Sequence, residues 1–338
     1  MKNEWRSHDV EMTNDTSPIV WVLTDGKAGD EQPMIGLAEA MEAKAILRRV
    51  APRRAFTWLM PMGPIDPKDA PSKQGSPLAP PFPDVCLATG RRAVPYLRKL
   101  KSTSPETFCV LFKDPLTSRH GADLLIVQEH DTPRGDNVLV TTTAPNRLSA
   151  ERLTEAHAAF AAALAPLPKP RVAVLIGGDS RHHRFTGKDI QRLLHGLHAK
   201  LDSGSALMIT TSRRTPPSLA KALADLAERP NVHLWDGKTE NPFLAYLSWA
   251  DEIIVTADST NMVGEAVAIG VPVQIFHPSG GHPKIDRFIA ALSRKLPLGR
   301  FPDMPVIGNH PPLNATKELA RQIMTRWQAF KAPPAPPS

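Results

Sequence analysis

Both halves of this sequence alternate short apolar runs with amphipathic stretches of helical period, which is typical of α/β proteins with parallel sheets. A proline-rich segment, 166–170, separates the halves, and 338 residues suit two domains of ordinary size. We therefore predict two Rossmann-like, doubly wound domains that face a cleft. Since ligands of such sheets bind beyond the carboxyl ends of the strands, we expect the functional residues in the loops that follow the strands.

The first half begins with a strand at 19–24 and a helix at 31–45. Further strands are predicted at 84–89, 107–113, 123–128 and 138–141, with a helix at 91–100. The intervening segment 61–83 is rich in proline, which predicts a long loop. A helical stretch at 149–164 closes this half.

The second half repeats the pattern. Strands are predicted at 171–176, 206–211, 231–235, 252–257 and 271–276, and helices near 190–201, 218–228, 242–249, 258–266, 285–292 and 316–330. The resulting division is a flexible N-terminus (1–17), an N-terminal domain (18–165), a linker (166–170), a C-terminal domain (171–330) whose last helix packs on the first domain, and a disordered proline-rich tail (331–338).

The net charge of +7 favours anionic partners, while the lack of a basic tail or a basic-aromatic stripe argues against nucleic acid. Cys86 and Cys109 lie in apolar, strand-like runs, which predicts buried free thiols, and no Cys/His spacing suggests a metal site. Without a signal-peptide core or an apolar stretch of about 20 residues, we expect a cytoplasmic protein, with peripheral membrane contact left open.

The most informative segment is 258–266, which lies between two predicted strands. Asp258 or Ser259 can cap the helix that begins there, and the free amides and positive dipole of its first turn suit a phosphate. Glu265, further along the helix, can accept hydrogen bonds from sugar hydroxyls. A plain β-α-β unit with a solvent-facing Glu265 remains the alternative.

In the first half, the loop from Asp25 to Gln32 follows the first strand. Its glycines allow a close approach of the backbone to a ligand, Lys27 supplies a cation, and Asp25 or Asp30 can act as a general base. The loop matches neither the Walker A pattern nor the dinucleotide fingerprint. After another strand, Gly90 and Arg91 offer helix amides and a guanidinium to an anion, with an ordinary helix start as the alternative.

In the second half, Gly177 and Gly178 end a strand and can cradle a phosphate with their amides. Ser212, Arg213 and Arg214 end the next strand and suit a pyrophosphate, although a capped helix start with surface arginines explains them equally well. The segment 280–284 follows the strand after Glu265 and can close over a ligand.

Four segments in order carry a family resemblance: 25–33 (DGKAGDEQP), 176–180 (IGGDS), 211–216 (TSRRTP) and 258–266 (DSTNMVGEA). Together they resemble the "elongated mitochondria" family, named for mitochondrial fission in plants and with many bacterial members. A wider resemblance is to GT-B glycosyltransferases, especially the enzyme that adds N-acetylglucosamine to lipid II. That enzyme's catalytic histidine and its Gln-Asn pair near the donor sugar have no counterpart here.

The resemblance implies that Glu265 binds a ribose and that Asp25, in place of the missing histidine, is the catalytic base. The residues assigned to the donor are Gly177, Gly178, Ser212, Arg213, Arg214, Asp258, Ser259, Met262 and Glu265. The residues assigned to the remaining substrate contacts are Gly26, Lys27, Gly29, Gln32, Gly90, Arg91, His282 and Lys284.

The favoured function is a metal-independent GT-B-type glycosyltransferase without a cofactor. It would take a nucleotide-diphospho sugar as donor and transfer the sugar to an unknown acceptor, with a lipid or cell-envelope molecule as one option. A non-catalytic adaptor that recruits a dynamin-like GTPase is the first alternative. A sugar-nucleotide epimerase, with His182 or His282 as a second acid/base group, is the other.

Overall fold

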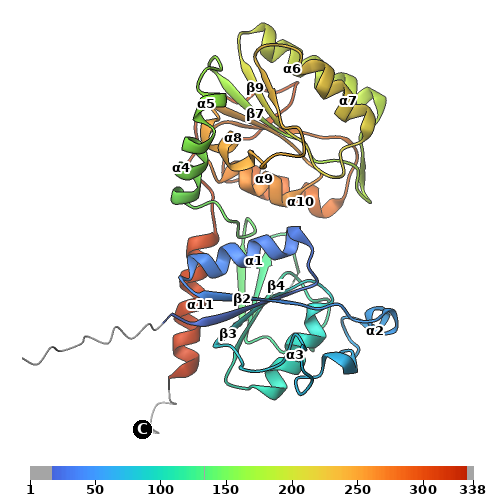
Figure 1. Cartoon of the computed structure of the whole chain (residues 1–338), viewed down its shortest axis with the longest axis vertical. Coiled ribbons are helices and arrows are strands. Elements are labelled where there is room, and N and C mark those ends of the chain that lie inside the picture. The colour runs from blue at the N-terminus through green and yellow to red at the C-terminus, as the bar shows by residue number, and fades with distance from the viewer. Residues whose placement is uncertain (1–16, 133, 333–338) are drawn as a thin grey trace, which may run out of the picture.

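The computed structural model describes residues 17–132 and 134–332, which form two α/β domains stacked along the long axis of the molecule (Figure 1). The first domain contains β1 (Ile19–Thr24), α1 (Ala28–Ala40), β2 (Lys44–Arg49), α2 (Arg54–Leu59), the 3-10 helix η1 (Pro67–Asp69), β3 (Val85–Thr89), α3 (Ala93–Thr103), β4 (Phe108–Phe112), β5 (Leu124–Gln128) and β6 (Val138–Thr141).

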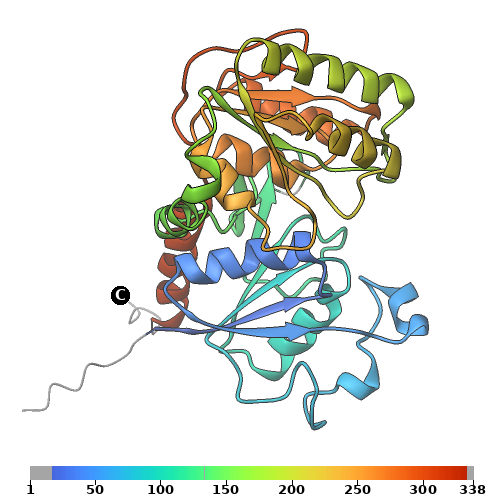
Figure 2. The same cartoon turned by 45° about the horizontal axis from the view of Figure 1, so that its top comes forward.

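The rest of the described chain contains α4 (Ala150–Ala159), α5 (Ala161–Leu164), β7 (Arg171–Leu175), β8 (His183–Arg184), α6 (Gly187–Asp202), β9 (Ala206–Thr210), α7 (Pro217–Leu226), β10 (Val232–Leu234), α8 (Phe243–Trp249), β11 (Glu252–Thr256), α9 (Thr260–Val267), β12 (Val273–Phe276), β13 (Ser279–Gly280), α10 (Pro283–Ser293), β14 (Gly299–Arg300) and α11 (Thr316–Lys331). Figure 2 shows helices on both faces of each sheet.

The strand orders locate the crevice of each domain. The first sheet has the order β2-β1-β3-β4-β5-β6 and the second has β10-β9-β7-β11-β12-β14, with all these pairs parallel. The chain changes direction of travel between β1 and β3 in the first sheet and between β7 and β11 in the second. Ligands of doubly wound sheets bind at these switch points, so ligand-binding residues are expected in the loops after β1, β3, β7 and β11.

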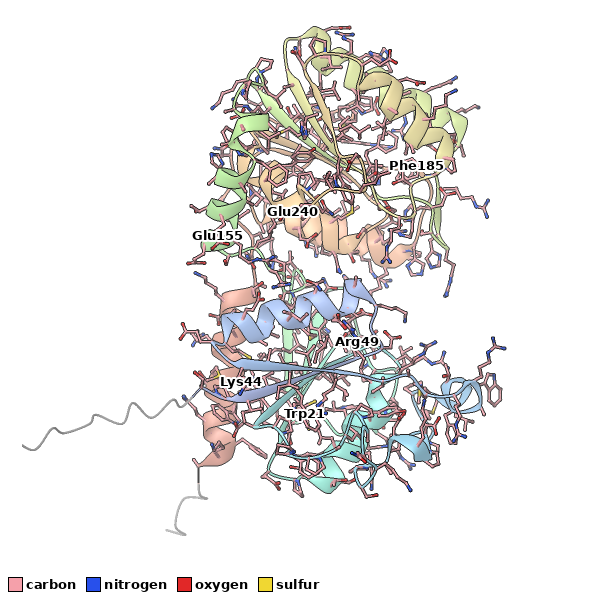
Figure 3. All side chains as sticks on the ribbon, in the orientation of Figure 1. Trp21, Lys44, Arg49, Glu155, Phe185 and Glu240 are labelled. Atoms are coloured by element: carbon pink, nitrogen blue, oxygen red, sulfur yellow. The ribbon has the colours of Figure 1, made fainter. Side chains whose placement is uncertain are left out.

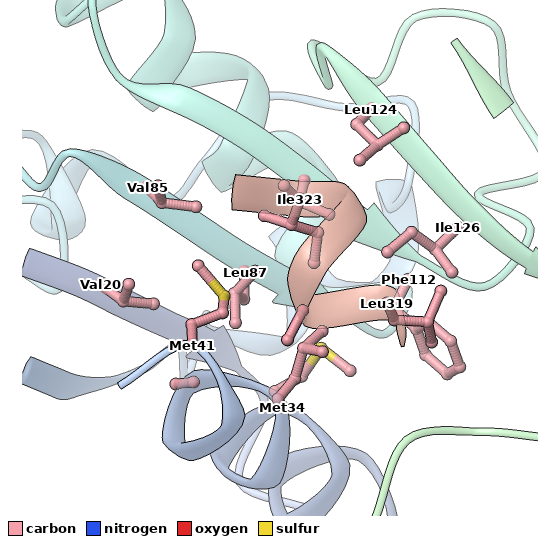
Figure 4. Close-up of a cluster of buried hydrophobic side chains, with 14 of the residues drawn as sticks. Val20, Met34, Met41, Val85, Leu87, Phe112, Leu124, Ile126, Leu319 and Ile323 are labelled. Atoms are coloured by element: carbon pink, nitrogen blue, oxygen red, sulfur yellow. The ribbon is translucent and has the colours of Figure 1, made fainter. Parts of the chain in front are cut away.

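The last helix returns to the first domain. In α11, Leu319, Ala320, Ile323 and Trp327 are buried in the core formed by α1 and one face of the first sheet (Figure 4). The helix thereby ties the end of the described chain to its beginning.

The domain boundary differs from the predicted linker at 166–170. Helices α4 and α5, assigned above to the first domain, pack on the second: Leu164 is fully buried in its core, and Leu153 and Phe160 pack against that core. The apolar face of α4 covers α8 rather than the first sheet. The chain therefore passes from the first domain to the second before α4. The predicted N-terminus 1–17 and tail 331–338 lie almost wholly outside the described residues.

Strand β2 corrects the predicted helix 31–45. Helix α1 ends at Ala40, and Glu42 adopts a left-handed φ of 53° that turns the chain into β2. Because β2 is an edge strand with polar, exposed positions at alternate residues, its sequence lacks the continuous apolar run of the central strands.

Cys86 and Cys109 are buried and free on neighbouring strands, as predicted. Across the described ranges, no helix is both long and apolar enough to span a bilayer.

Candidate functional site

Two adjoining cavities lie between the domains. The inner cavity, of about 620 Å³, is lined by α1, α8, α9 and the segment 144–148, and includes Gln32, Ser212, Phe243, Met262 and Glu265. The basic cavity, of about 470 Å³, is lined by Lys27, Lys113, Lys284, His182, His282 and the start of α9. Gly29, Ser259 and Asn261 line both, so the two cavities adjoin at the switch point of each sheet.

Glu265 is the acidic group of the inner cavity, whose lining also includes Arg147 and Arg152. It lies on α9, is half-buried, and makes no side-chain hydrogen bond or ion pair within residues 17–132 and 134–332. Burial raises the pKa of this carboxyl group to about 7. A carboxylate left without a protein partner at the floor of a cavity is costly, and such groups are characteristic of ligand-binding sites.

The start of α9 lies where the two cavities meet. Ser259 is its N-cap and accepts a hydrogen bond from the amide of Met262 at 3.4 Å. The first amides of a helix have no acceptor within the helix and carry its positive dipole end, which suits an anion. Asn261 Nδ2 also donates to the Gly29 carbonyl at 2.8 Å and so joins the two domains across the cleft.

Asp258 organises the loops around this helix. Its carboxylate accepts hydrogen bonds from Thr256 Oγ1 at 2.7 Å, the Gly178 amide at 3.0 Å and Arg214 at 2.8 Å. A Cβ at Gly177 would lie 2.2 Å from this carboxylate, and one at Gly178 would lie 2.0 Å from the Arg214 carbonyl oxygen. The structure thus brings these four predicted donor residues together, but they contact one another, and their glycines allow the loops to pack.

Three lysines from both domains surround the basic cavity. Lys27 pairs with Asp25 at 2.6 Å, Lys284 pairs with Asp131 at 2.8 Å, and Lys113 pairs with Asp30. The rings of His182 and His282 lie 4.2 Å apart, and desolvation together with the neighbouring His282 lowers the pKa of His182. Each of these lysines is paired with an aspartate, and Asp30 and Asp258 also line the cavity, so an anionic ligand would bind there by drawing lysines from these pairs.

Asp25 lies behind Lys27. Its side chain is 1% exposed, Lys27 and Arg92 approach Oδ2 at 2.6 Å and 3.9 Å, and Oδ1 is buried with no hydrogen-bond partner. A Cβ at Gly90, whose φ is +89°, would lie 4.0 Å from Asp25 Oδ1, so the loop after β3 closes the other side of the carboxylate. Asp30, by contrast, lines the basic cavity directly.

An ion pair between exposed Arg49 and buried Glu31, which the sequence did not predict, supports the loop after β1. Arg49, at the cleft-facing end of β2 (Figure 3), donates to both Glu31 oxygens at 2.8 Å. These bonds lower the pKa of Glu31. Thr24 Oγ1 donates to Glu31 and accepts from the Gly26 amide at 3.0 Å, so the pair fixes the turn that carries Lys27.

Not every predicted residue reaches these cavities. Arg91 donates to the carbonyls of Met60 and Trp58, and Arg213 is exposed; neither lines the two cavities, nor does Gly90. Gln32 lines the inner cavity and accepts a hydrogen bond from Arg147 at 2.9 Å. Three residues of the inner cavity were not predicted. Phe243 and Arg147 do not directly follow a predicted strand, and no local pattern marks Asn261 as a ligand contact.

Among the described residues, no three His, Cys, Asp or Glu side chains are grouped so as to hold a metal ion.

Comparison with known proteins identifies the family of this chain. The family model described as mitochondrial fission ELM1 matches residues 28–327. The chain belongs to this family. The Arabidopsis thaliana mitochondrial fission protein ELM1 is 28% identical over 269 residues, which cover 71% of this chain and 63% of that protein. The chain spans less than two thirds of the length of the relatives it matches.

Solved structures show the same fold. A UDP-N-acetylglucosamine 2-epimerase of Methanocaldococcus jannaschii is 11% identical with a TM-score of 0.52, and the match covers 92% of this chain and 99% of that one. A putative UDP-N-acetylglucosamine 2-epimerase of Listeria monocytogenes is 14% identical with a TM-score of 0.52, covering 93% and 90%. At these identities the likeness concerns the fold, and it confirms the predicted GT-B-like pair of Rossmann-like domains.

Proposed function

We propose that this protein is a glycosyltransferase that binds a nucleotide-diphospho sugar between its domains. The observation that carries the proposal is the unpartnered Glu265 carboxylate in the inner cavity, which lies on the same helix, α9, whose first turn faces the basic cavity. A ribose supplies the two neighbouring hydroxyl donors that such a carboxylate lacks, and a diphosphate attached to it would reach the helix start.

The donor would then occupy both cavities. The nucleoside fits the inner cavity, where the ring of Phe243 offers a stacking surface for the base. The diphosphate fits the basic cavity, where Lys27, Lys113 and Lys284 supply positive charge. This placement assigns to lysines the role that the sequence suggested for Arg213 and Arg214, since the three lysines line the basic cavity and neither arginine does.

The reaction would be a displacement at the anomeric carbon. A hydroxyl oxygen of the acceptor forms the new bond to this carbon while the bond to the diphosphate oxygen breaks. The lysines and the start of α9 stabilise the charge that develops on the departing diphosphate. Asp25 takes the hydroxyl proton once Lys27 turns from its carboxylate to the diphosphate. A lipid or cell-envelope acceptor would place this reaction at a membrane surface.

Calorimetric titration with UDP, GDP, ADP, CMP and their sugar conjugates tests the proposal. We expect one nucleotide to bind and Glu265→Ala to weaken it roughly tenfold to hundredfold, because each hydrogen bond to a charged group contributes about 1.5–3 kcal/mol. Glu228→Ala, which removes an exposed carboxylate from the end of α7, is the matched control. Failure of every nucleotide to bind would overturn the proposal and favour an adaptor that recruits a dynamin-like GTPase.

One observation favours a second candidate, a sugar-nucleotide epimerase. His182 and His282 lie side by side in the lining of the basic cavity, with ring centroids 4.2 Å apart, and either imidazole could exchange a proton with a sugar bound there. Incubation of the donor without an acceptor would distinguish this activity from transfer. An epimerase would give a product of unchanged mass with the NMR spectrum of the epimer.

A further inference from the structure

An apolar tip lies on the outer edge of the first domain, away from both cavities. We use the name for Trp58, Leu59, Met62 and Leu116, which are 81%, 44%, 72% and 75% exposed. Helix α2, which carries the first two, projects from the edge of the domain in both views (Figures 1 and 2). Large apolar side chains gathered in the solvent mark a surface that is covered in use.

The tip is held in place rather than left loose. The Arg98 guanidinium, on α3, donates to the carbonyls of Met62 and Gly63 at 3.1 Å and 2.6 Å, and to the Arg119 carbonyl at 3.1 Å. One side chain therefore clamps the turn after α2 to the loop that carries Leu116.

The backbone at Leu116 also favours a binding role. This residue has a φ of +56°, in the left-handed region that a bulky side chain rarely adopts. The Asp114 carboxylate accepts a hydrogen bond from the Leu116 amide at 2.8 Å and supports the turn. A leucine exposed in this conformation gains no packing within the domain, which is in keeping with a side chain that a partner covers.

The charges around the tip are positive. Arg54, Lys68, Arg91 and Arg119 are exposed, and Arg98 is half-buried among them. Three acidic groups lie nearby: Asp66 is buried and paired with Arg53, Asp69 is buried and accepts a hydrogen bond from the Tyr96 hydroxyl, and half-buried Asp114 accepts one from the Leu116 amide. An apolar centre within a cationic collar is complementary to a layer of lipid that carries negative headgroups.

We propose that the apolar tip docks this protein on a bilayer surface that contains anionic phospholipid. The four apolar side chains enter the boundary between headgroups and acyl chains, and the arginines contact phosphates. Lys113 of the basic cavity precedes Leu116 in the same loop, so docking brings the cleft within reach of a molecule embedded in the bilayer. The inference extends the proposed function but does not depend on nucleotide binding, so either can fail alone.

Co-sedimentation of the full chain with vesicles tests the docking surface. The vesicles are phosphatidylcholine alone or phosphatidylcholine with about 30% phosphatidylglycerol. We expect binding to the anionic vesicles only, weakened by salt, and reduced about tenfold in the Trp58→Ser/Met62→Ser variant and in Arg54→Glu/Arg119→Glu.

The control variant is Met304→Ser/Ile307→Ser, which removes two apolar side chains that are 65% and 94% exposed on the second domain. It should bind vesicles like the wild type, and all variants should keep the wild-type unfolding midpoint because the changed side chains are exposed. Absence of vesicle binding, or equal binding by the wild type and the tip variant, would overturn the proposal. The first of these results would point to a protein as the occupant of the tip.

Discussion

Two aspartates occupy comparable places in the two domains and are used differently. Asp25 follows β1 and Asp258 follows β11, so each lies at the carboxyl end of a strand that borders the switch point of its sheet. Both side chains are almost fully buried, at 1% and 0% exposed. Asp258 has donors on both carboxylate oxygens, whereas Oδ1 of Asp25 has none.

The difference in hydrogen bonding indicates a structural role for Asp258 and a chemical role for Asp25. A buried carboxylate with every oxygen bonded is committed to holding its neighbours, and Asp258 holds the loops after β7 and β9 in this way. A buried oxygen without a donor costs stability that its domain must recover elsewhere, which is a common property of functional groups. Two buried aspartates at strand ends that border a switch point can therefore have different roles.

The largest effect is expected for Asp258→Ala. The change leaves Arg214, which is 45% exposed, and the buried Gly178 amide and Thr256 hydroxyl without their common acceptor, and each buried donor left unpaired costs about 1–3 kcal/mol. Urea denaturation should show this loss, while Asp225→Ala, on the exposed face of α7, should change the free energy of unfolding by less than about 0.5 kcal/mol. A loss below about 1 kcal/mol for Asp258→Ala would refute the supporting role.

Glu265 extends the comparison to a carboxylate that the second domain leaves without a partner. Its pKa, about 7 in the folded protein, exceeds its ordinary value of 4.5, so the folded state binds the proton more tightly than the unfolded state. Its contribution to stability is full below pH 4.5 and is lost as the pH rises through 7.

The variant Glu265→Gln cannot ionise, so its free energy of unfolding should not decrease in this way as the pH rises. It should match the wild type near pH 4.5 and exceed it by on the order of 3 kcal/mol at pH 8, from the 2.5 units between 7 and 4.5. Denaturation curves across this range measure the difference. A gap between the two proteins that stays constant with pH would show that Glu265 titrates normally.

Asp25→Asn should have the opposite profile to Asp258→Ala. Because Oδ1 has no donor to lose and Lys27 can remain hydrated, we expect the free energy of unfolding to change by less than about 1 kcal/mol. Turnover of the donor identified by calorimetry should fall about 10²- to 10⁴-fold, the usual contribution of a general base. A variant that unfolds as easily as Asp258→Ala, or one that keeps full turnover, would place Asp25 with the supporting residues.

The sequence predicts best what is local. The Ser259 cap and the position of Glu265 follow from a strand, a polar turn and a helix that are adjacent in the chain. Two features depend on contacts between distant segments and could not be found this way: the Glu31–Arg49 pair, and the packing of α4 and α5 on the second domain. Arg91 contacts backbone carbonyls and Arg214 contacts Asp258, and their assignment to a ligand stays a prediction, since a guanidinium at a strand end serves a ligand or a protein oxygen equally well.

The smallest effect on stability is expected for Lys27→Ala. This variant tests whether Lys27 only pairs with Asp25 or also binds the donor. The Lys27 side chain is 67% exposed, so its pair with Asp25 should contribute only about 0.2–1 kcal/mol to folding. If Lys27 moves to the diphosphate during the reaction, the same change should weaken donor binding by more than this and should reduce the salt dependence of binding. Lys221→Ala, on α7, controls for the loss of one exposed charge. Calorimetry at two salt concentrations decides the point, because a lysine that only neutralises Asp25 would leave the affinity for the donor unchanged.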